Sequence, residues 1–214
     1  MSTLWVDRTE KIPADSRHLE GILQIPRTPR GIVLFAHGSG SGRYSERNNF
    51  VAGVLRASGM GTLLFDLLTE DEARDRRNVF DIDLLARRLL CATEHIRNGT
   101  ETRNLSIGYF GASTGAAAAL QASVMTDATI RAIVSRGGRP DMVMSILGRV
   151  KAPTLFIVGG DDDVVIELNK EAYDRVTCEK QFKIIPGATH LFEEPGKLEE
   201  VARIAAEWFI THLP

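Results

Sequence analysis

Short runs of hydrophobic residues alternate along the chain with longer segments that carry hydrophobic residues at helical spacing. Gly, Pro or polar residues bound each run, a pattern typical of strands buried on both faces of a parallel sheet. The predicted strands of this kind are Ile32–Ala36, Thr62–Phe65, Leu105–Phe110, Ile130–Val134, Thr154–Val158 and Phe182–Ile185. The predicted helices are Glu46–Ala57, Asp81–Arg97, Thr114–Met125, Glu167–Val176 and Val201–His212. This alternation indicates an α/β protein with crossover helices.

Two less apolar segments near the N-terminus, Thr3–Asp7 and Leu19–Ile25, predict an antiparallel edge with a turn at Ile12-Pro13-Ala14-Asp15 between them. They bring the expected sheet to eight mostly parallel strands with helices on both faces. The stretch Glu70–Arg77 mixes charges of both signs and is expected to be a solvated loop. No repeat or linker interrupts the chain, so residues 1–214 are expected to form one domain.

Charge and composition narrow the range of partners. The 26 Lys and Arg residues against 28 Asp and Glu give a net charge of −2, which disfavours nucleic-acid binding. Charged residues from Asp7 to Lys11 interrupt any signal peptide, and no apolar run has transmembrane length, so a cytoplasmic protein without membrane contact is expected. The two cysteines, Cys91 and Cys178, have no metal-like or redox-like spacing and are expected to be free thiols; no metal site is predicted.

A candidate nucleophile lies where a predicted strand meets a predicted helix. The segment Leu105–Phe110 continues directly into Gly111-Ala112-Ser113-Thr114-Gly115 and then into the strong helix former Ala116–Leu120. In a G-x-S-x-G turn of this kind the serine has a strained backbone, and the glycines remove side chains that would clash. The helix N-terminus then faces negative charge that develops on a substrate. Ser113 is therefore the predicted nucleophile.

A serine nucleophile needs a base, and the base needs a carboxylate that orients it. His190 lies in the loop between the last strand and the last helix, which should emerge at the same sheet edge as Ser113. The acid is expected in the turn after Thr154–Val158, where Asp161, Asp162 and Asp163 are adjacent; Asp141 is a weaker alternative. The order Ser, Asp, His is the one expected of α/β hydrolases.

The strand Ile32–Ala36 leads into His37-Gly38-Ser39-Gly40-Ser41-Gly42, a turn whose amides can point at a developing oxyanion. The main-chain amides of Ser39 and Thr114 are the expected donors. A dinucleotide-binding fingerprint is the alternative, because Gly38-x-Gly40 follows a strand and Asp66 ends the next one. Arg43 occupies the position of the required third glycine, so no cofactor is predicted.

Together these motifs resemble the dienelactone hydrolase branch of the α/β-hydrolase superfamily, from about residue 20 to the end of the chain. The similarity is greatest to bacterial members found alone or fused to a phosphoribosyltransferase-like domain. It implies Asp162 as the acid and Ser39 and Thr114 as the oxyanion donors. Dienelactone hydrolases proper use a cysteine nucleophile, whereas this chain has Ser113, so the resemblance implies hydrolase chemistry without specifying a dienelactone substrate.

Cap insertions in this superfamily usually follow the strand that corresponds to Ile130–Val134. Only Ser135 to Ala152 separates that strand from the next, which allows a short helix near Pro140–Leu147 and no cap domain. The expected function is hydrolysis of a small ester or lactone through an acyl-enzyme. Acyl transfer on the same triad and a non-catalytic binding or regulatory domain are the alternatives. Four loop arginines could ring the mouth of the site and bind an anionic substrate: Arg43, Arg47, Arg136 and Arg139.

Overall fold

The computed structural model describes residues 4–213. Its strands form one sheet in the order β1-β2-β4-β3-β5-β6-β7-β8, in which β1, β2 and β4 pair antiparallel and all other neighbours pair parallel. The strands are β1 Leu4–Ala14, β2 Arg17–Pro26, β3 Gly31–Ala36, β4 Met60–Phe65, β5 Ser106–Ala112, β6 Ile130–Arg136, β7 Thr154–Gly159 and β8 Lys180–Ile185. The predicted eight-stranded, mostly parallel sheet is confirmed.

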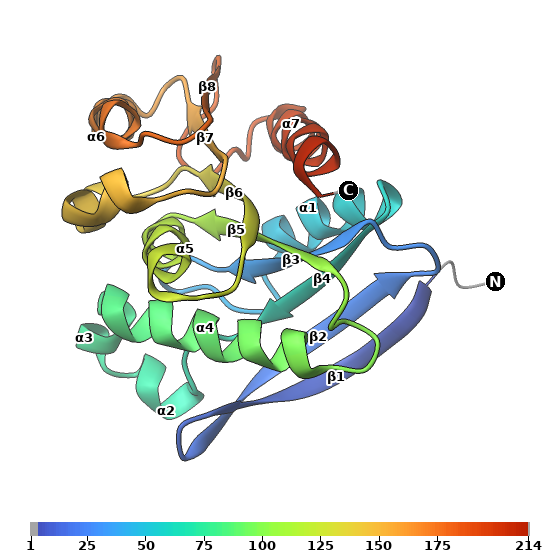
Figure 1. Ribbon diagram of the computed structural model, residues 1–214. Coiled ribbons are helices and arrows are strands. Elements are labelled where there is room, and N and C mark those ends of the chain that lie inside the picture. The colour runs from blue at the N-terminus through green and yellow to red at the C-terminus, as the bar shows by residue number, and fades with distance from the viewer. Residues whose placement is uncertain (1–3, 214) are drawn as a thin grey trace.

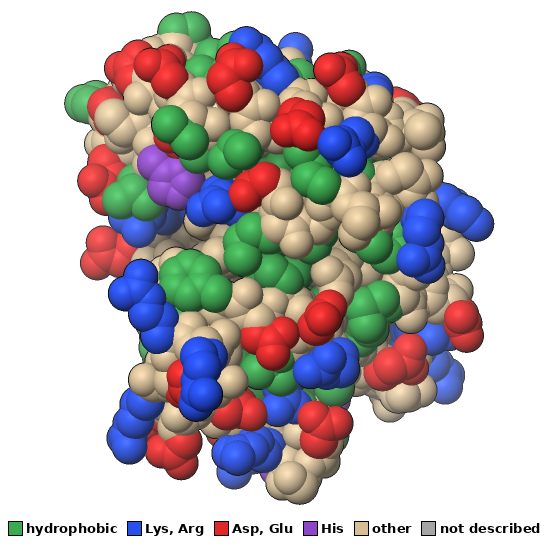
Figure 2. Space-filling view, turned by 90° about the vertical axis from the view of Figure 1, so that its left-hand side faces the viewer, with side chains coloured by type: hydrophobic (Ala, Val, Ile, Leu, Met, Phe, Trp, Pro, Cys, Tyr) green, Lys and Arg blue, Asp and Glu red, His purple; other side chains and the backbone are tan. Residues whose placement is uncertain are grey.

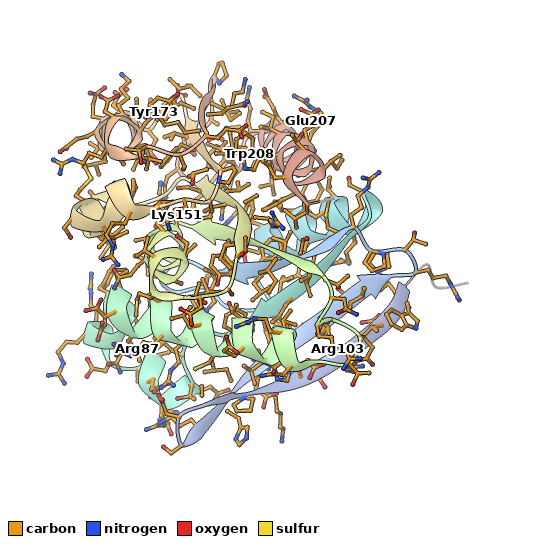
Figure 3. All side chains as sticks on the ribbon, viewed as in Figure 1. Arg87, Arg103, Lys151, Tyr173, Glu207 and Trp208 are labelled. Atoms are coloured by element: carbon orange, nitrogen blue, oxygen red, sulfur yellow. The ribbon has the colours of Figure 1, made fainter. Side chains whose placement is uncertain are left out.

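The helices cover both faces of this sheet, as predicted (Figure 1). They are α1 Glu46–Ala57, α2 Glu70–Ala73, α3 Arg76–Val79, α4 Ile82–Asn98, α5 Thr114–Met125, α6 Asp163–Arg175 and α7 Lys197–His212, with a 3₁₀ helix η1 at Pro140–Arg149. One layer contains α4, α5, η1 and α6, and the other contains α1 and α7, each with its own apolar core against the strands. The second core includes Trp208, which lies on the sheet side of α7, whereas its neighbour Glu207 is exposed (Figure 3).

Hydrophobic spacing and capping explain where the helices form. Ser45 caps α1 by accepting a hydrogen bond from the amide of Asn48, and Asp81 caps α4 in the same way through the amide of Leu84. Helix α5 differs because its run of alanines is buried on all sides, between the sheet, α4 and η1. Small side chains let the helix pack close to the sheet, which brings its N-terminus to the end of β5.

The N-terminal prediction is wrong in its boundaries. Residue 3 lies outside the described residues, and β1 continues through the predicted turn as far as Ala14. Pro13 is tolerated because β1 is an edge strand whose outer side needs no backbone donor. The reversal takes place at Asp15, which has a positive φ of 54°.

Three other expectations need correction. The stretch Glu70–Arg77 is not a plain loop, because it contains α2 and the start of α3. Thr69 caps α2 in a capping box with Glu72, a local signal that the mixed charges obscured. Strand β8 lies at the sheet edge and is largely exposed rather than fully buried. Helix α6 begins at Asp163 rather than Glu167, directly after the turn that carries the three aspartates.

Within the described residues, the connection from β6 to β7 holds only η1, so no cap domain covers the carboxyl ends of the strands there. Figure 2 views the molecule from the side on which the parallel strands end. Hydrophobic side chains gather in the middle of this face, with charged side chains around them. In the described part of the chain, no helix is long and apolar enough to cross a membrane.

Candidate active site

Ser113 lies at the turn from β5 to α5 in an unusual backbone conformation, with φ 51° and ψ −121°. Two glycines make this turn possible. A Cβ atom at position 111 would lie 2.7 Å from the amide nitrogen of Ala116, and one at position 115 would overlap the carbonyl oxygen of Ala36. The G-x-S-x-G pattern is therefore required by close packing of α5 onto the strands.

Hydrogen bonds from the next strand hold this turn in place. The Ser113 amide donates to the Arg136 carbonyl over 3.2 Å, and the Ser113 carbonyl accepts from the amides of Ala116 and Arg139 at 3.0 and 3.1 Å. Because the end of β6 and the loop after it supply two of these three partners, the position of Ser113 depends on the β5–β6 pairing. A strained conformation persists only where its surroundings fix it in this way.

The structure brings two further predicted residues into contact. Nδ1 of His190 and Oδ2 of Asp162 are 2.7 Å apart. The Asp162 side chain is mostly buried at the start of α6, and about two fifths of the His190 side chain is exposed. The loops that carry them are joined by a hydrogen bond from the Asp161 amide to the Ala188 carbonyl at 2.9 Å. Nε2 of His190 forms no hydrogen bond within residues 4–213, so that nitrogen is left for another group.

The alternative acids are placed elsewhere. Asp161 and Asp163, on either side of Asp162, are exposed, and neither side chain forms a hydrogen bond or ion pair with His190. Asp141 is bound by Arg139 in a bidentate ion pair with both distances at 2.8 Å. Of the four candidate carboxylates, Asp162 is the one that reaches the imidazole.

Ser113 and His190 line one cavity of about 190 Å³. Its wall also includes Gly38, Ser39 and Ser41 from the loop after β3, and Arg47 and Arg136. No hydrogen bond joins Ser113 to His190 in this structure; a hydrogen bond between a nucleophile and its base often forms fully only in the complex with substrate.

The loop after β3 lies beside Ser113, as predicted. A Cβ atom at Gly38 would approach the Ser113 Cβ to 3.1 Å, so the two segments touch. Within the described residues, neither the Ser39 amide nor the Thr114 amide donates a hydrogen bond. Thr114 is the first residue of α5, where amides have no partner inside the helix. Both amides are therefore free to bind an oxygen.

His37 holds this loop in place, a role that its sequence position alone did not indicate. The Leu67 amide donates to Nε2 of His37 over 3.0 Å, so Nδ1 carries the proton and donates to the Gly38 carbonyl over 2.9 Å. Burial lowers the pKa of His37, which keeps the ring neutral in this tautomer. A His-Gly pair directly after a buried strand is the signal that could have indicated this role.

The four candidate arginines do not ring one mouth. Arg43 forms an ion pair with Asp66, and its amide donates to the same carboxylate over 2.7 Å. This pair also occupies the carboxylate that a ribose would need in the dinucleotide-binding alternative. Arg139 is committed to Asp141. Of the four, Arg47 and Arg136 line the cavity of Ser113.

Arg136 is buried, with 7% of its surface exposed, and has no carboxylate partner in the described part of the chain. Its guanidinium makes one long hydrogen bond, 3.4 Å, to Oδ1 of Asn48 and lies 5.8 Å above the Phe192 ring. Its Nε has no hydrogen-bond partner among residues 4–213. Burial lowers the pKa of Arg136 to about 10, and the charge of Arg47 adds to this effect. Nothing in the sequence marks Asn48 or Phe192 as its neighbours.

Arg47, the second arginine of the cavity, is ion-paired with Glu193 at 2.7 Å, but both side chains are partly or largely exposed. Exposed pairs of this kind contribute little stability, about 0–1 kcal/mol. Arg47 is therefore free to exchange its partner. Within the described residues, no group of three or more His, Cys, Asp or Glu side chains is arranged to hold a metal ion.

The sheet order, the strained serine turn and the paired Asp162 and His190 define the chain as an α/β hydrolase. Comparison with known proteins makes this assignment specific. The sequence profile of the Dienelactone hydrolase family matches residues 66–210, and the chain belongs to that family. The resemblance inferred from the sequence motifs is thus confirmed.

Two solved structures illustrate the relationship. A dienelactone hydrolase from Anabaena variabilis is 49% identical, with a TM-score of 0.96 and complete coverage of both chains. Est1E from Butyrivibrio proteoclasticus is 16% identical and shares the fold, with a TM-score of 0.80 over 95% of this chain and 98% of its own.

Sequence comparison also finds a Mycobacterium tuberculosis protein, in two strains, that carries the provisional name phosphoribosyl transferase. It is 55% identical over 207 residues, which are 97% of this chain but 47% of the relative. The chain therefore spans about half the length of these curated relatives.

The role of His37 yields a prediction about stability. Because burial lowers the pKa of His37 in the folded state, the unfolded chain binds more protons below pH about 6.5. Its contribution to the free energy of unfolding is complete above that pH and is lost as the pH falls. His37→Phe leaves the buried Leu67 amide unpaired and removes one of the two hydrogen bonds to the Gly38 carbonyl, so we expect a loss of about 1–3 kcal/mol at pH 7.5.

Urea unfolding at pH 7.5, 6.5 and 5 tests this expectation. The decline in stability between pH 6.5 and 5 should be shallower in His37→Phe than in the wild type. His18→Phe is the matched control, because His18 is exposed. An identical decline in His37→Phe and wild type would contradict the assigned tautomer and its role.

Proposed function

We propose that this chain is a serine hydrolase that cleaves a small carboxylic ester or lactone through an acyl-enzyme on Ser113. The observation that carries the proposal is the 2.7 Å contact between Asp162 and His190 in a loop whose histidine shares a cavity with the strained Ser113. Nucleophile, base and orienting carboxylate come from three separate loops, after β5, β8 and β7. Their types and order match the acid–base–nucleophile logic of serine hydrolases.

In the first half-reaction, Nε2 of His190 takes the hydroxyl proton of Ser113 as Oγ attacks the substrate carbonyl carbon. The Asp162 carboxylate accepts a hydrogen bond from Nδ1–H of His190, which fixes the tautomer and stabilises the imidazolium. The tetrahedral oxyanion lies between the amides of Ser39 and Thr114. As it collapses, the carbon–oxygen ester bond breaks and the leaving alkoxide receives the proton from His190.

In the second half-reaction, His190 takes a proton from water, and the resulting hydroxide attacks the acyl-enzyme carbonyl. Collapse of this intermediate breaks the bond to Oγ, and His190 returns its proton to Ser113. The product is the free acid. An oxyanion donor typically contributes about 3–4 kcal/mol to lowering the barrier, so the unpaired Ser39 and Thr114 amides are central to the rate. An alcohol that replaces water would give acyl transfer on the same residues.

Arg136 and Arg47 provide the substrate selectivity in this proposal. A buried guanidinium without a carboxylate lies in the cavity of the nucleophile, and a second, exchangeable arginine lies beside it. A carboxylate or phosphate of the substrate would satisfy both charges, and charge-assisted hydrogen bonds of this type are strong. The substrate is therefore an ester that carries an anionic group.

The alternatives from the sequence are less well supported. A non-catalytic binding domain has no need of an oriented imidazole beside a strained serine. The provisional name of the tuberculosis relatives refers to proteins about twice as long as this chain. The hydrolase site described above lies in the half that they share with it.

The nucleophile and base are tested by removing each of them. Ser113→Ala and His190→Ala should each abolish labelling by a fluorophosphonate probe and lower turnover of p-nitrophenyl esters by several orders of magnitude, because both act in one proton-coupled step. Circular dichroism should show an unchanged fold. Ser123→Ala, on the same helix and remote from the cavity, is the control. Retained labelling of a folded Ser113→Ala protein would refute the proposal.

The acid is tested by three neighbouring substitutions. Asp162→Asn should lower kcat by orders of magnitude, since only the residue that reaches the imidazole fixes its tautomer. Asp161→Asn and Asp163→Asn are built-in controls of the same chemistry and should have small effects. Steady-state kinetics on one ester settles the comparison. Equal losses at all three positions would rule out a specific role for Asp162.

Anion selectivity is tested with a neutral ester and its carboxylate-bearing analogue. Arg136→Met should reduce the preference for the charged ester about 10- to 100-fold in kcat/KM, the equivalent of a lost charge-assisted hydrogen bond. The melting temperature should not fall, because the substitution removes a buried charge that lacks a carboxylate partner. Phosphate should raise the melting temperature of the wild type but not of this variant.

Arg139→Met is the control for this experiment, because Arg139 is paired with Asp141 and does not line the cavity. If Arg136→Met leaves the ratio of the two esters unchanged, Arg136 has no part in substrate binding.

A further inference from the structure

A second and larger cavity, of about 500 Å³, also borders the loop after β3. Its floor is apolar and consists of Leu67 and Leu68, which follow β4, together with Val79 at the end of α3 and Leu85 of α4. The hydrolytic steps above do not use this cavity. Its volume is in the range of sites that bind small organic molecules.

The two cavities meet at the candidate reaction centre. Gly38, Ser39 and Ser41 line both of them. Ser113 lines the smaller cavity, and Thr114, the next residue, lines the larger one. A carbonyl carbon bonded to Ser113, with its oxygen between the Ser39 and Thr114 amides, therefore has one cavity on each side.

Proton transfer decides which part of the substrate enters which cavity. If Ser113 and His190 act as proposed, His190 must donate its proton to the leaving oxygen, so the leaving group lies on the side of His190. His190 lines only the smaller of these two cavities, which it shares with Arg47 and Arg136. The acyl substituent must extend in the opposite direction. The geometry points to the larger cavity, which we call the acyl chamber, as the site of the acyl group.

Charges around the acyl chamber define the chemistry of its occupant. Glu20 and Glu70 line it, and the charge of Asp66 is balanced by Arg43. Apart from that pair, the charged groups of the lining are the two carboxylates, accompanied by His18. A carboxylate on the acyl group would be repelled, while the leucine and valine floor favours hydrocarbon. The acyl group is therefore uncharged and aliphatic or aromatic.

The outer wall of the acyl chamber is held in place by a buried charge network. Arg88 of α4, with 4% of its surface exposed, binds Glu72 of α2 and Asp15 of the β1–β2 turn, each at 2.8 Å. Because Arg88 is buried, the loss of either carboxylate would leave an uncompensated buried charge and would lower the stability of this region. Arg88 thus holds α2 in place, and Asn78 of α3 donates to the Glu72 carbonyl over 2.9 Å, so the chamber is formed before substrate binds.

This inference, which depends on the proposed function, gives a specific substrate class. The acid part of the ester is an uncharged, apolar group, and the alcohol part carries the carboxylate or phosphate. Hydroxy acids and phosphorylated alcohols that bear a hydrophobic acyl group have this composition.

The experiment measures kcat/KM for p-nitrophenyl esters from acetate to decanoate. In the wild type, kcat/KM should rise about fourfold for each methylene that the chamber buries, until it is full. Val79→Phe should lower the octanoate-to-acetate ratio at least tenfold by narrowing the chamber where a long acyl chain would lie. Ala73→Phe, a more exposed position of the same lining, is a second variant in case Val79→Phe misfolds.

Val124→Phe is the matched control and should leave the ratio unchanged. Val124 is also partly buried against the same core but lies near the C-terminal end of α5, about 15 Å along the helix from Thr114. A second series, in which acetate is esterified to alcohols of increasing length, should be insensitive to Val79→Phe.

The possible outcomes are distinct. A reduced acyl-length dependence in Val79→Phe or Ala73→Phe, with the alcohol series unaffected, supports the assignment. If the variants change the alcohol series instead, or neither series, the acyl assignment is overturned while the hydrolase proposal stands. If wild-type protein shows neither hydrolysis nor probe labelling, the proposed function fails, and the acyl assignment fails with it.

Discussion

The contact between α5 and the carboxyl ends of β3 and β5 is the constraint on which the rest of the site depends. Gly115 lies against the Ala36 carbonyl with no room for a Cβ atom, and this contact fixes how far α5 enters the sheet edge. That depth requires the left-handed backbone of Ser113. It also directs the Thr114 amide, the first of the helix, toward the loop after β3. One contact therefore explains the strained backbone of Ser113, the position of its side chain and the position of the proposed oxyanion donor.

At Arg136, the requirements of stability and of the proposed function conflict. Its carbonyl holds the amide of Ser113, so its backbone belongs to the structural frame of the turn. Its side chain is buried with no carboxylate partner, which disfavours its charged form. A fold optimised only for stability would have an apolar residue at this position. The cost is understandable if a substrate anion supplies the missing partner, and the stacking on Phe192 keeps the guanidinium directed at that place.

The sequence was sufficient to predict the sheet, the helical layers and the loops that carry Ser113, Asp162 and His190. Each depends on short-range patterns: buried β-strands, glycine spacing and the residue that follows a strand. Partnerships between distant segments could not be predicted. Arg43 is removed from the expected anion site by Asp66, which follows another strand, whereas Arg139 is removed by its near neighbour Asp141. Nothing in the sequence distinguishes Arg136 from Arg43, because the difference is that no carboxylate lies near Arg136 in the described part of the folded chain.

The acyl chamber was missed for a related reason. Its wall is made from the segment of mixed charges that was expected to be a solvated loop, yet α2 and α3 bury none of their own residues. Their attachment depends on Arg88 and Glu72, which come from different elements. Because Val79 is the one described side chain of these helices that packs against the buried core, and it is itself only partly buried, substitutions in α2 and α3 can alter the chamber at small cost to the fold. The two sides of the proposed reaction centre are thus built differently. The leaving-group side includes Arg136, whose backbone belongs to β6 and holds the serine turn. The acyl side is formed in part by the short helices α2 and α3, where substitutions can change substrate selectivity.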